Sequence, residues 1–450
     1  MVDYSTKSFW LGLTPYQENP PLQGELRVDV AIIGGGFTGI ATAYFLKQAA
    51  PSLHVVVLES HVVGFGASGR NGGFSMTLFG LTMGTTAFRF GKDKARQAQH
   101  YMERAVDLVD QLVKEHNIDC DYEYNGFLRV ATTPAYARRI QKEIKLAESL
   151  GIEGIEWLDA KRTREQVNSP LYLGAWREPR CAILNPAKLV RGMKKVAEQC
   201  GAVVYERTPV QEYHSGPKLR LVTPQGAVIA DKVVFATNAF SSFFPQLRSR
   251  QVPIHTHIIL TEPLRPEHFA EIGWQNRQGI EDARNFVHYY RLTSDNRLLV
   301  GGERTQYYYG NRTDIDEHRP TYRVLERFAH QAYPCLQDLR VAHHWGGPVS
   351  GTLDFAPMIG YLGRDKRVVY SLGCMGHGVS LSHLNGQTLS DLILERQTER
   401  TEVFFVNRRY IPLPAEPFRF AITNAVLDLM RVQDWWDESK GLGKVNHTDD

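Results

Sequence analysis

The apolar positions of the chain fall into short continuous runs that alternate with amphipathic stretches, a pattern typical of α/β proteins. Val28–Ile33 is a short apolar run rich in β-branched residues, which predicts a buried strand. Phe37–Gln48 follows with apolar residues at helical spacing, and His54–Leu58 is a second apolar run. This β-α-β order predicts two parallel strands joined by a right-handed crossover.

The rest of the chain alternates between long charged helices and β-rich segments. We expect helices at Asp93–Asn117, Ala135–Leu150, Pro186–Gln199, near Gly386–Glu395 and near Phe418–Trp436. We expect strands at Gly126–Ala131, Ala230–Thr237, Val252–Thr261, Phe286–Arg291, Arg297–Gly301 and Val368–Leu372. Ala230–Thr237 and Val368–Leu372 are apolar enough to join the parallel sheet, whereas the segments between them suggest an antiparallel one.

Two domains interleaved along the sequence account for this order. We assign 28–84, 185–245 and 340–400 to a nucleotide-binding domain, 85–184 and 246–339 to a second domain, 1–27 to a leader and 401–450 to a C-terminal extension. The charged and aromatic helix near Phe418–Trp436 has mixed charges, which favours docking on the protein's own surface over a membrane surface.

Composition narrows the functional classes. Of the 450 residues 43% are hydrophobic and 22% charged, and a net charge of +3 gives no basic excess for binding nucleic acid. No signal peptide and no membrane-spanning run is recognisable. The five cysteines form no CxxC pair, which predicts a reducing, cytoplasmic setting.

One glycine motif points to a dinucleotide. Gly34-Gly35-Gly36-Phe37-Thr38-Gly39 fits GxGxxG, follows a predicted strand and opens a predicted helix. Gly34 permits the tight turn, Gly36 lets the backbone approach a pyrophosphate, and Gly39 allows close packing of helix and strand. Glu59 ends the next strand twenty positions after Gly39, where it can bind ribose hydroxyls and disfavours NADP.

Two distant segments extend the motif. Gly64-Phe65-Gly66-Ala67-Ser68-Gly69-Arg70-Asn71-Gly72-Gly73 follows the acidic strand end, and Gly373-Cys374-Met375-Gly376-His377-Gly378-Val379 follows the last buried strand. With GGGFTG they make the chain resemble the D-amino-acid-oxidase-like FAD-dependent oxidoreductases, most closely the amine-oxidising branch typified by γ-glutamylputrescine oxidoreductase. The resemblance implies a Rossmann-like FAD-binding domain interleaved with an α+β substrate domain built on an antiparallel sheet.

The resemblance also implies which residues hold FAD. The first loop would follow the pyrophosphate, ribityl chain and ring, with donors from Arg70 and Asn71, and the second turn would face the far end of the ring. The expected cofactor-binding residues are Gly34, Gly36, Phe37, Thr38, Gly39, Glu59, Ser60, Gly66, Ala67, Ser68, Gly69, Arg70, Asn71, Gly72, Gly73, Val210, Thr237, Asn238, Gly376, His377, Gly378 and Val379.

Two absences refine these expectations. Related sarcosine-oxidase-like enzymes tether the flavin through a cysteine just before the Thr352-x-Asp354 segment, where this chain has none, so we expect non-covalent FAD. Cys374 is more simply interpreted as a small buried residue. Some relatives carry an oxygen-activating lysine in the strand that reads Arg297-Leu-Leu-Val-Gly301 here, so rapid reaction with oxygen is not implied.

The strand His288-Tyr289-Tyr290-Arg291 is the candidate substrate wall. Alternation puts Tyr289 and Arg291 on one face and His288 and Tyr290 on the other, and the sequence does not decide which faces the flavin. An inward Arg291 would suit a carboxylate. The candidate catalytic residues are His377, Tyr290, Arg291, His257 and Trp345. His255-x-His257 lacks a third metal ligand, so no metal is expected.

Three functions remain open. The first is removal of a hydride from the carbon next to the nitrogen of a small amine, giving an imine that hydrolyses to an aldehyde and ammonia or an amine. The second is a D-amino-acid, glycine or sarcosine oxidase. The third is a flavin-binding redox protein without turnover. The expected partners are a small amine or amino acid and oxygen or another electron acceptor.

Overall fold

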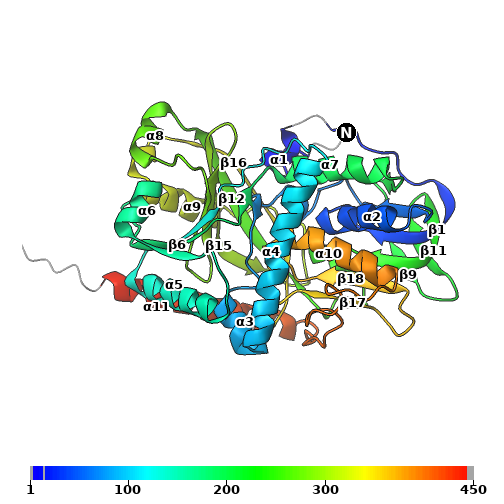
Figure 1. The fold of residues 1–450 in the computed structure, drawn as a ribbon. Helices are drawn as coiled ribbons and strands as arrows, with labels where there is room; N and C mark the ends of the chain where they lie inside the picture. The colour runs from blue at the N-terminus through cyan, green and yellow to red at the C-terminus, as the bar shows by residue number, and fades with distance from the viewer. Residues whose placement is uncertain (1–3, 14–15, 443–450) are drawn as a thin grey trace, which may run out of the picture.

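Two eight-stranded sheets stand side by side in the computed structural model, which describes residues 4–13 and 16–442 (Figure 1). One sheet is mainly parallel and lies with α2 and α10 on the right of Figure 1; the other is mainly antiparallel and lies with α8 and α9 on the left. The expected α/β architecture of a Rossmann-like domain interleaved with an α+β domain is confirmed.

The first sheet collects strands from three separated parts of the chain. In spatial order they are β17 (Met358–Tyr361), β18 (Val368–Leu372), β11 (Gly226–Phe235), β1 (Gly24–Ile33), β2 (Val55–Leu58) and β8 (Val203–Tyr205), with β10 (Leu219–Thr223) on β11 and β9 (Glu212–His214) on β10. The strands β18, β11, β1, β2 and β8 pair in parallel. The predicted parallel pair of β1 and β2 is confirmed, as is the return of the chain to this sheet in β11 and β18.

Helices cover one face of this sheet and share a core with it. They are α2 (Phe37–Ala49), α4 (Lys92–Glu115), α7 (Pro186–Gln199) and α10 (Gly378–Ile393). The start of α7 follows from local chemistry: Pro186 occupies the first turn, and the Asn185 side chain accepts a hydrogen bond from the N–H of Lys188 at 3.1 Å. The sequence therefore predicts both ends of α7 correctly.

The second sheet carries the candidate substrate wall. In order it contains β16 (Val341–Gly351), β12 (Val252–Pro263), β15 (Arg297–Tyr307), β14 (His288–Leu292), β13 (Gly279–Asp282), β4 (Phe127–Ala131), β6 (Gly174–Glu178) and β5 (Glu156–Asp159). The remaining elements are a small sheet of β3 (Phe74–Ser75) and β7 (Ala182–Ile183), the helices α1 (Phe9–Gly12), α3 (Met83–Phe90), α5 (Pro134–Ser149), α6 (Ala160–Gln166), α8 (Pro266–Ile272), α9 (Arg319–Ala332) and α11 (Phe418–Leu442), and the short turns η1 (Ala67–Gly69), η2 (Asn238–Phe243) and η3 (Pro334–Leu336).

Three elements do not follow the segment boundaries expected from the sequence. β16 pairs with β12 in the second sheet, although its sequence lies in the 340–400 segment assigned to the nucleotide-binding domain. α4 lies within 85–184 yet packs into the core of the first sheet. The leader 1–27 contains the beginning of β1 and the short helix α1. For β16 and α4, contacts between segments that are distant in sequence decide which sheet the element joins, and local patterns do not encode these contacts.

No helix in the described part of the chain combines the length and apolar character that a membrane span requires.

Candidate cofactor and active site

Two neighbouring cavities run through the junction of the sheets. The nucleotide cavity, of about 100 Å³, lies beyond the carboxyl ends of β1, β2, β11 and β18 and at the beginning of α2. The main cavity, of about 230 Å³, lies against β12, β14 and β16 and continues to α5 and α11. Ala67 and Pro348 line both, so the two cavities adjoin. An elongated ligand could therefore occupy both.

The glycine motif forms the tight turn that its spacing predicts. Gly34 has a φ of +108°, and a Cβ there would lie 2.6 Å from the carbonyl oxygen of Ala236. A Cβ on Gly39 would lie 1.9 Å from the carbonyl oxygen of Gly34, so α2 could not approach β1 as closely. The turn thus directs the N-terminus of α2 at the nucleotide cavity, where its dipole favours an anion.

Glu59 stands in the nucleotide cavity, held by backbone donors. Its two carboxylate oxygens accept hydrogen bonds from the N–H of Gly35 at 2.7 Å and from the N–H of His61 at 2.9 Å. Burial raises the pKa of this carboxyl, and the two N–H groups oppose the rise. Its position beside the glycine turn fits the binding of ribose hydroxyls.

The loop 64–73 is fixed mainly by its own side chains. The Asn71 side chain donates to the carbonyl of Ala67 at 2.9 Å and accepts from the N–H of Gly73 at 2.7 Å, so its polar atoms serve the loop. Arg70 donates to Asp316 at 2.7 Å and to the carbonyl of Phe65 at 2.7 Å. Both residues line the main cavity, yet their donors are largely engaged within the protein.

Two tryptophans hold the same loop from outside. Trp345 donates its indole N–H to the carbonyl of Arg70 at 2.8 Å, and Trp10 donates to the carbonyl of Asn71 at 3.0 Å. Ser8, which caps α1, donates to the carbonyl of Gly69 at 2.6 Å. Trp345 does not line either cavity, so its contact with the site passes through the loop.

His377 lies at the wall of the main cavity, immediately before α10. Burial lowers the pKa of its imidazole to about 4, and a hydrogen bond with the backbone of Gly80 offsets this only in part. The side chain is therefore neutral at physiological pH. Its Nδ1 has no hydrogen-bond partner among the described residues, which leaves one polar atom for a ligand.

Most predicted cofactor residues come together at the cavities. Those that line them are Gly34, Gly36, Phe37, Thr38, Glu59, Ser60, Gly66, Ala67, Ser68, Arg70, Asn71, Gly72, Thr237, Asn238, Gly376, His377 and Val379. Those that do not are Gly39, Gly69, Gly73, Val210 and Gly378. The glycines in this second group shape the turns, whereas Val210 packs at the edge of the first sheet's core.

The face of β14 that meets the main cavity is the one carrying Tyr289. This side chain lines the cavity and crosses over Gly72, where a Cβ would lie 2.8 Å from the tyrosine ring. Arg291 shares this face but lies beyond the cavity. It donates to the carbonyls of Gly72 and Leu184, each at 2.7 Å. Arg291 therefore supports the cofactor loop from behind rather than facing a substrate.

Tyr290 points to the opposite side of the sheet. It is fully buried, and its hydroxyl lies 2.8 Å from that of Tyr172, which in turn lies 2.9 Å from that of Tyr333. The expectation that Tyr290 contacts substrate is corrected here, because alternation along β14 makes Tyr289 the residue at the cavity.

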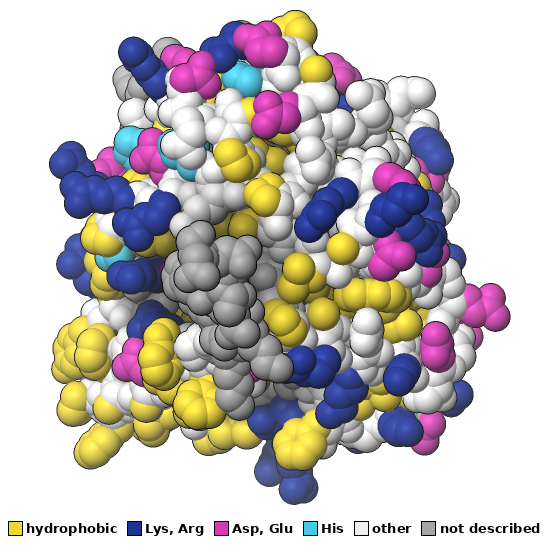
Figure 2. Space-filling view, turned by 90° about the vertical axis from the view of Figure 1, so that its left-hand side faces the viewer, with side chains coloured by type: hydrophobic (Ala, Val, Ile, Leu, Met, Phe, Trp, Pro, Cys, Tyr) yellow, Lys and Arg dark blue, Asp and Glu magenta, His cyan; other side chains and the backbone are white. Residues whose placement is uncertain are grey.

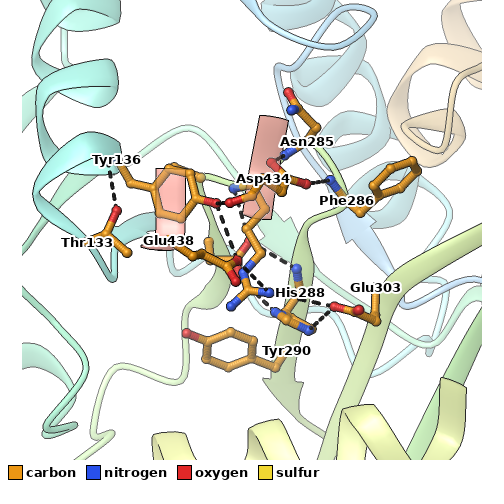
Figure 3. Close-up of polar contacts among 12 residues, drawn as sticks. Thr133, Tyr136, Asn285, Phe286, His288, Tyr290, Glu303, Asp434 and Glu438 are labelled. Atoms are coloured by element: carbon orange, nitrogen blue, oxygen red, sulfur yellow. Dashed lines mark hydrogen bonds and ion pairs between the residues drawn. The ribbon is translucent and has the colours of Figure 1, made fainter. Parts of the chain in front are cut away.

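Four arginines line the main cavity, and each is paired with a carboxylate. Arg70 pairs with Asp316, Arg129 with Glu281 at 2.6 Å, Arg139 with Asp437 at 2.6 Å, and Arg284 with Asp282 at 3.2 Å and Glu438 at 3.0 Å. His288 lies between Asp282, at 2.7 Å, and Glu303, at 2.9 Å. Figure 3 shows it beside Glu303. Burial alone would lower the pKa of His288, but the two carboxylates raise it.

Glu143 is the exception among the cavity carboxylates. Both of its oxygens accept from the N–H of Gly84 at 3.1 Å, and among the described residues it has no ion-pair partner. Glu281, Asp282 and Glu303, the other carboxylates that line the cavity, are each paired with a cation.

His257 lies on the face of β12 that turns away from the cavity. Thr256 and Ile258 line the cavity instead. His257 is fully buried beside His318 and Tyr322, and neither ring nitrogen has a hydrogen-bond partner among the described residues. The expectation of a catalytic His257 is corrected for the same reason as that of Tyr290.

Replacing His257 with leucine is expected to make stability less sensitive to acid. Burial lowers the pKa of His257 to about 3, so below pH 6.5 the unfolded chain binds a proton that the folded chain does not. Proton uptake by His257 in the unfolded chain then lowers the free energy of unfolding by about 2 kcal/mol between pH 7 and pH 5. Urea unfolding at the two pH values measures the difference. His100→Gln on the surface is the control; equal pH slopes for wild type and His257→Leu would contradict the burial argument.

His255 does not form a metal site with its neighbour. Its ring nitrogens lie 2.8 Å from the carbonyl oxygen of Ile315 and 2.9 Å from that of Arg312. Within the described ranges, no group of three His, Cys, Asp or Glu side chains is arranged to hold a metal ion.

Sequence reasoning missed several residues at the site. Tyr289 was one of two alternatives on its strand, and only the fold decides between them. Glu143 lies in α5, which the sequence shows only as a charged helix, and Leu427 and Met430 come from α11 in the C-terminal extension. Ser8 and Trp10 carry no recognisable motif. No local signal distinguishes these residues from ordinary surface or core positions.

Comparisons with known proteins agree with this geometry. The family model described as DAO, FAD dependent oxidoreductase, matches residues 29–392. Gamma-glutamylputrescine oxidoreductase of Escherichia coli is 32% identical over 417 residues, which cover 92% of this chain and 94% of that protein. Glycine oxidase of Bacillus subtilis is 22% identical, covering 83% of this chain and 94% of that protein. The crystal structure of glycine oxidase from Geobacillus kaustophilus superposes with a TM-score of 0.72 at 21% identity, covering 86% of this chain and 100% of that one.

Proposed function

The chain belongs to the DAO family of FAD dependent oxidoreductases, and on that premise we propose that it oxidises a small amine at the carbon next to nitrogen. The imine formed would hydrolyse in water to an aldehyde and ammonia or a smaller amine. A primary or secondary amine without a carboxylate is the preferred substrate, and an α-amino acid is the alternative.

The cavities fit FAD on structural grounds. The glycine turn, which admits no Cβ at Gly34 or Gly39, and the carboxylate of Glu59 together suit the adenosine and pyrophosphate. Gly66, Ala67 and Gly72 would leave room for the ring as it enters the main cavity. Bound FAD supplies the hydride acceptor. Tyr289 and His377 would shape the space beside it, and the neutral His377 offers a hydrogen bond through Nδ1.

The pairing of the cavity arginines with carboxylates favours an amine over an amino acid as the substrate. A substrate carboxylate needs a free guanidinium for a bidentate contact, yet Arg70, Arg129, Arg139 and Arg284 each have a carboxylate partner among the described residues. Displacing a buried partner would leave an uncompensated charge and cost several kcal/mol. The carboxylate of Glu143, by contrast, is available to a cationic amine.

Anaerobic mixing with a panel of amines and amino acids tests the proposal. Amines are expected to bleach the flavin absorbance at lower concentrations than amino acids of equal size. Faster bleaching by glycine, sarcosine or a D-amino acid would transfer the function to the alternative. No bleaching by any compound would favour a flavin-binding redox protein without turnover. Repeating the assay in air while following peroxide separates an oxidase from a dehydrogenase.

Replacing Glu143 with glutamine is expected to raise KM for amine substrates about tenfold. The loss of one hydrogen bond to a charged group costs about 1.5 kcal/mol, which corresponds to roughly a tenfold change in affinity. Steady-state kinetics measure the change, with Glu148→Gln on the exposed side of the same helix as the matched control. An unchanged KM, with FAD bound normally, would remove Glu143 from substrate binding.

We also propose that FAD is bound without a covalent bond. Cys374 belongs to the second turn and lines the nucleotide cavity. Burial raises the pKa of its thiol, which keeps it protonated and poorly nucleophilic. Acid denaturation is expected to release all yellow colour from the polypeptide. Colour that stays with the protein would overturn this.

A further inference from the structure

The helix α11 is attached to the body through both polar and apolar side chains. Both carboxylate oxygens of Asp434 accept from backbone N–H groups, those of Asn285 at 2.8 Å and Phe286 at 3.0 Å (Figure 3). Arg431 donates to the carbonyl of Thr305 at 2.8 Å. On the same inner face, Leu427 and Met430 line the main cavity. The inner face of α11 is therefore packed against the rest of the chain.

The outer face of α11 is apolar and exposed. Seven of the fifteen large hydrophobic side chains that are exposed in the described part of the chain lie in this one helix: Phe418, Phe420, Ile422, Leu429, Val432, Trp435 and Trp436. Leu429 is 71% exposed and Trp435 is 64% exposed. Hydrophobic side chains gather along the lower part of the face shown in Figure 2, the side on which α11 ends. A helix that is apolar on both sides normally buries both.

The outward residues have the spacing of a helix-pairing seam. Phe418, Ile422, Ala425, Leu429, Val432 and Trp436 follow one another at intervals of four, three, four, three and four residues. This is the repeat with which two helices pack side chains between one another. We call these six residues the α11 seam.

The α11 seam is also symmetric about Leu427, which makes it complementary to itself. In an antiparallel pair of α11 helices centred there, Phe418 meets Trp436, Ile422 meets Val432, and the small Ala425 meets the larger Leu429. Each contact matches aromatic with aromatic, β-branched with β-branched, or small with large. The isologous contact of a two-fold dimer requires this symmetry.

The exposed area is sufficient for such a pair. A large side chain buries about 150–250 Å² when it is fully covered. Because the seven exposed side chains, five of which belong to the α11 seam, are only 39–71% exposed, they offer roughly 600–1,000 Å² per copy. Two copies would bury about twice that area, which reaches the range of roughly 1,200–2,000 Å² found in specific interfaces.

Charge and sequence composition disfavour two other ways of covering the α11 seam, which are a lipid surface and the last residues of the chain. Asp428, Asp434, Asp437 and Glu438 outweigh Arg419, Arg431 and Lys440 on α11, so the helix lacks the basic excess that draws amphipathic helices to anionic lipid. The last eight residues, GKVNHTDD, contain a single large apolar side chain, so their sequence offers little apolar area to the seam. We propose that the α11 seam packs against the same seam of a second copy of this chain, forming an antiparallel two-helix contact.

Solution mass and the introduction of one charge into the seam test the pairing. Wild-type protein is expected to sediment at twice the chain mass of 51.0 kDa at micromolar concentration. Leu429→Glu is expected to weaken the dimer at least about 100-fold while leaving the unfolding temperature within a few degrees, because this side chain touches mainly solvent. Phe88→Glu, at a side chain that is 92% exposed on α3, is the control and should stay dimeric.

Cross-linking tests the orientation. In the antiparallel pair the two copies of residue 428 lie within about 10–15 Å, because paired helices are about 8–10 Å apart. The two copies of residue 418 lie about 27 Å apart along the axis, at 1.5 Å per residue. A bismaleimide shorter than about 15 Å should therefore cross-link the two chains of Asp428→Cys and not those of Phe418→Cys. Wild-type protein is the control for cross-links through the five native cysteines.

Three results would overturn the proposal. The first is a monomer at every concentration, including one that floats with phosphatidylcholine vesicles, which would make lipid the occupant. The second is a dimer that Leu429→Glu leaves intact. The third is cross-linking through residue 418 in place of residue 428. None of these readouts depends on catalysis, so they stand apart from the proposed amine oxidation.

Discussion

Replacing Gly39 with alanine is expected to weaken FAD binding by at least about 100-fold. The added Cβ would lie 1.9 Å from the carbonyl oxygen of Gly34, so the first turn of α2 must move away from β1. That movement withdraws the N–H groups that the helix terminus offers to the pyrophosphate. Losing two hydrogen bonds to a charged group costs about 3–6 kcal/mol, which corresponds to roughly a 100-fold to 10⁴-fold change in affinity.

Titration of apoprotein with FAD, followed by the change in flavin fluorescence, measures this effect. Gly216→Ala is the matched control, because a Cβ at Gly216 meets nothing closer than 3.5 Å and its φ is ordinary. The apoprotein of Gly39→Ala should still unfold cooperatively, since the clash is confined to one turn. FAD affinity equal to that of the control would mean that the glycine turn does not contact the cofactor.

The parallel sheet and the glycine turn were predictable because their signals are local. Val28–Ile33 and Phe37–Gln48 show their strand and helix periods directly, and the glycine spacing specifies the turn between them. Asn185 and Pro186 likewise define the start of α7 within a few residues. Such features depend on neighbours in sequence, and the structure agrees with them closely.

The part of the main cavity next to β14, α5 and α11 depends on contacts that the sequence does not encode. Alternation along β14 divides Tyr289 from Tyr290 correctly but cannot state which face meets the cavity, since both faces of this sheet are covered. The sequence does not indicate the strand β16 or its pairing with β12, because this stretch lies within the 340–400 segment and carries no local pairing signal. Glu143 and Met430 reach the cavity only through the docking of α5 and α11.

Arg291 illustrates how the same residue type can serve substrate or scaffold. The sequence left open a carboxylate contact for this side chain. In the structure it is buried, lies over the ring of Trp10, and donates to the carbonyls of Gly72 and Leu184. Burial lowers the pKa of its guanidinium to about 10, which still leaves it charged. Its charged guanidinium therefore binds backbone oxygens at the base of the cofactor loop.

Replacing Arg291 with methionine is expected to weaken FAD binding about 10–100-fold and to lower the free energy of unfolding by about 2–6 kcal/mol. Methionine fills a similar volume but leaves two buried carbonyl oxygens without donors, each at a cost of about 1–3 kcal/mol. The loop at Gly72 would then lose the contact that holds it beside Tyr289. FAD titration and urea unfolding of the apoprotein measure the two effects separately.

Tyr290→Phe is the control that separates loop support from general stability. It removes the hydroxyl that lies 2.8 Å from that of Tyr172, on the opposite face of the same strand, so it should lower stability while leaving FAD affinity unchanged. At saturating FAD, Arg291→Met should also retain the wild-type KM for amines, because Arg291 does not line the cavity. The opposite pattern, normal FAD affinity with a KM for amino acids raised more than about 100-fold, would make Arg291 the carboxylate anchor after all and would move the substrate from amines to amino acids.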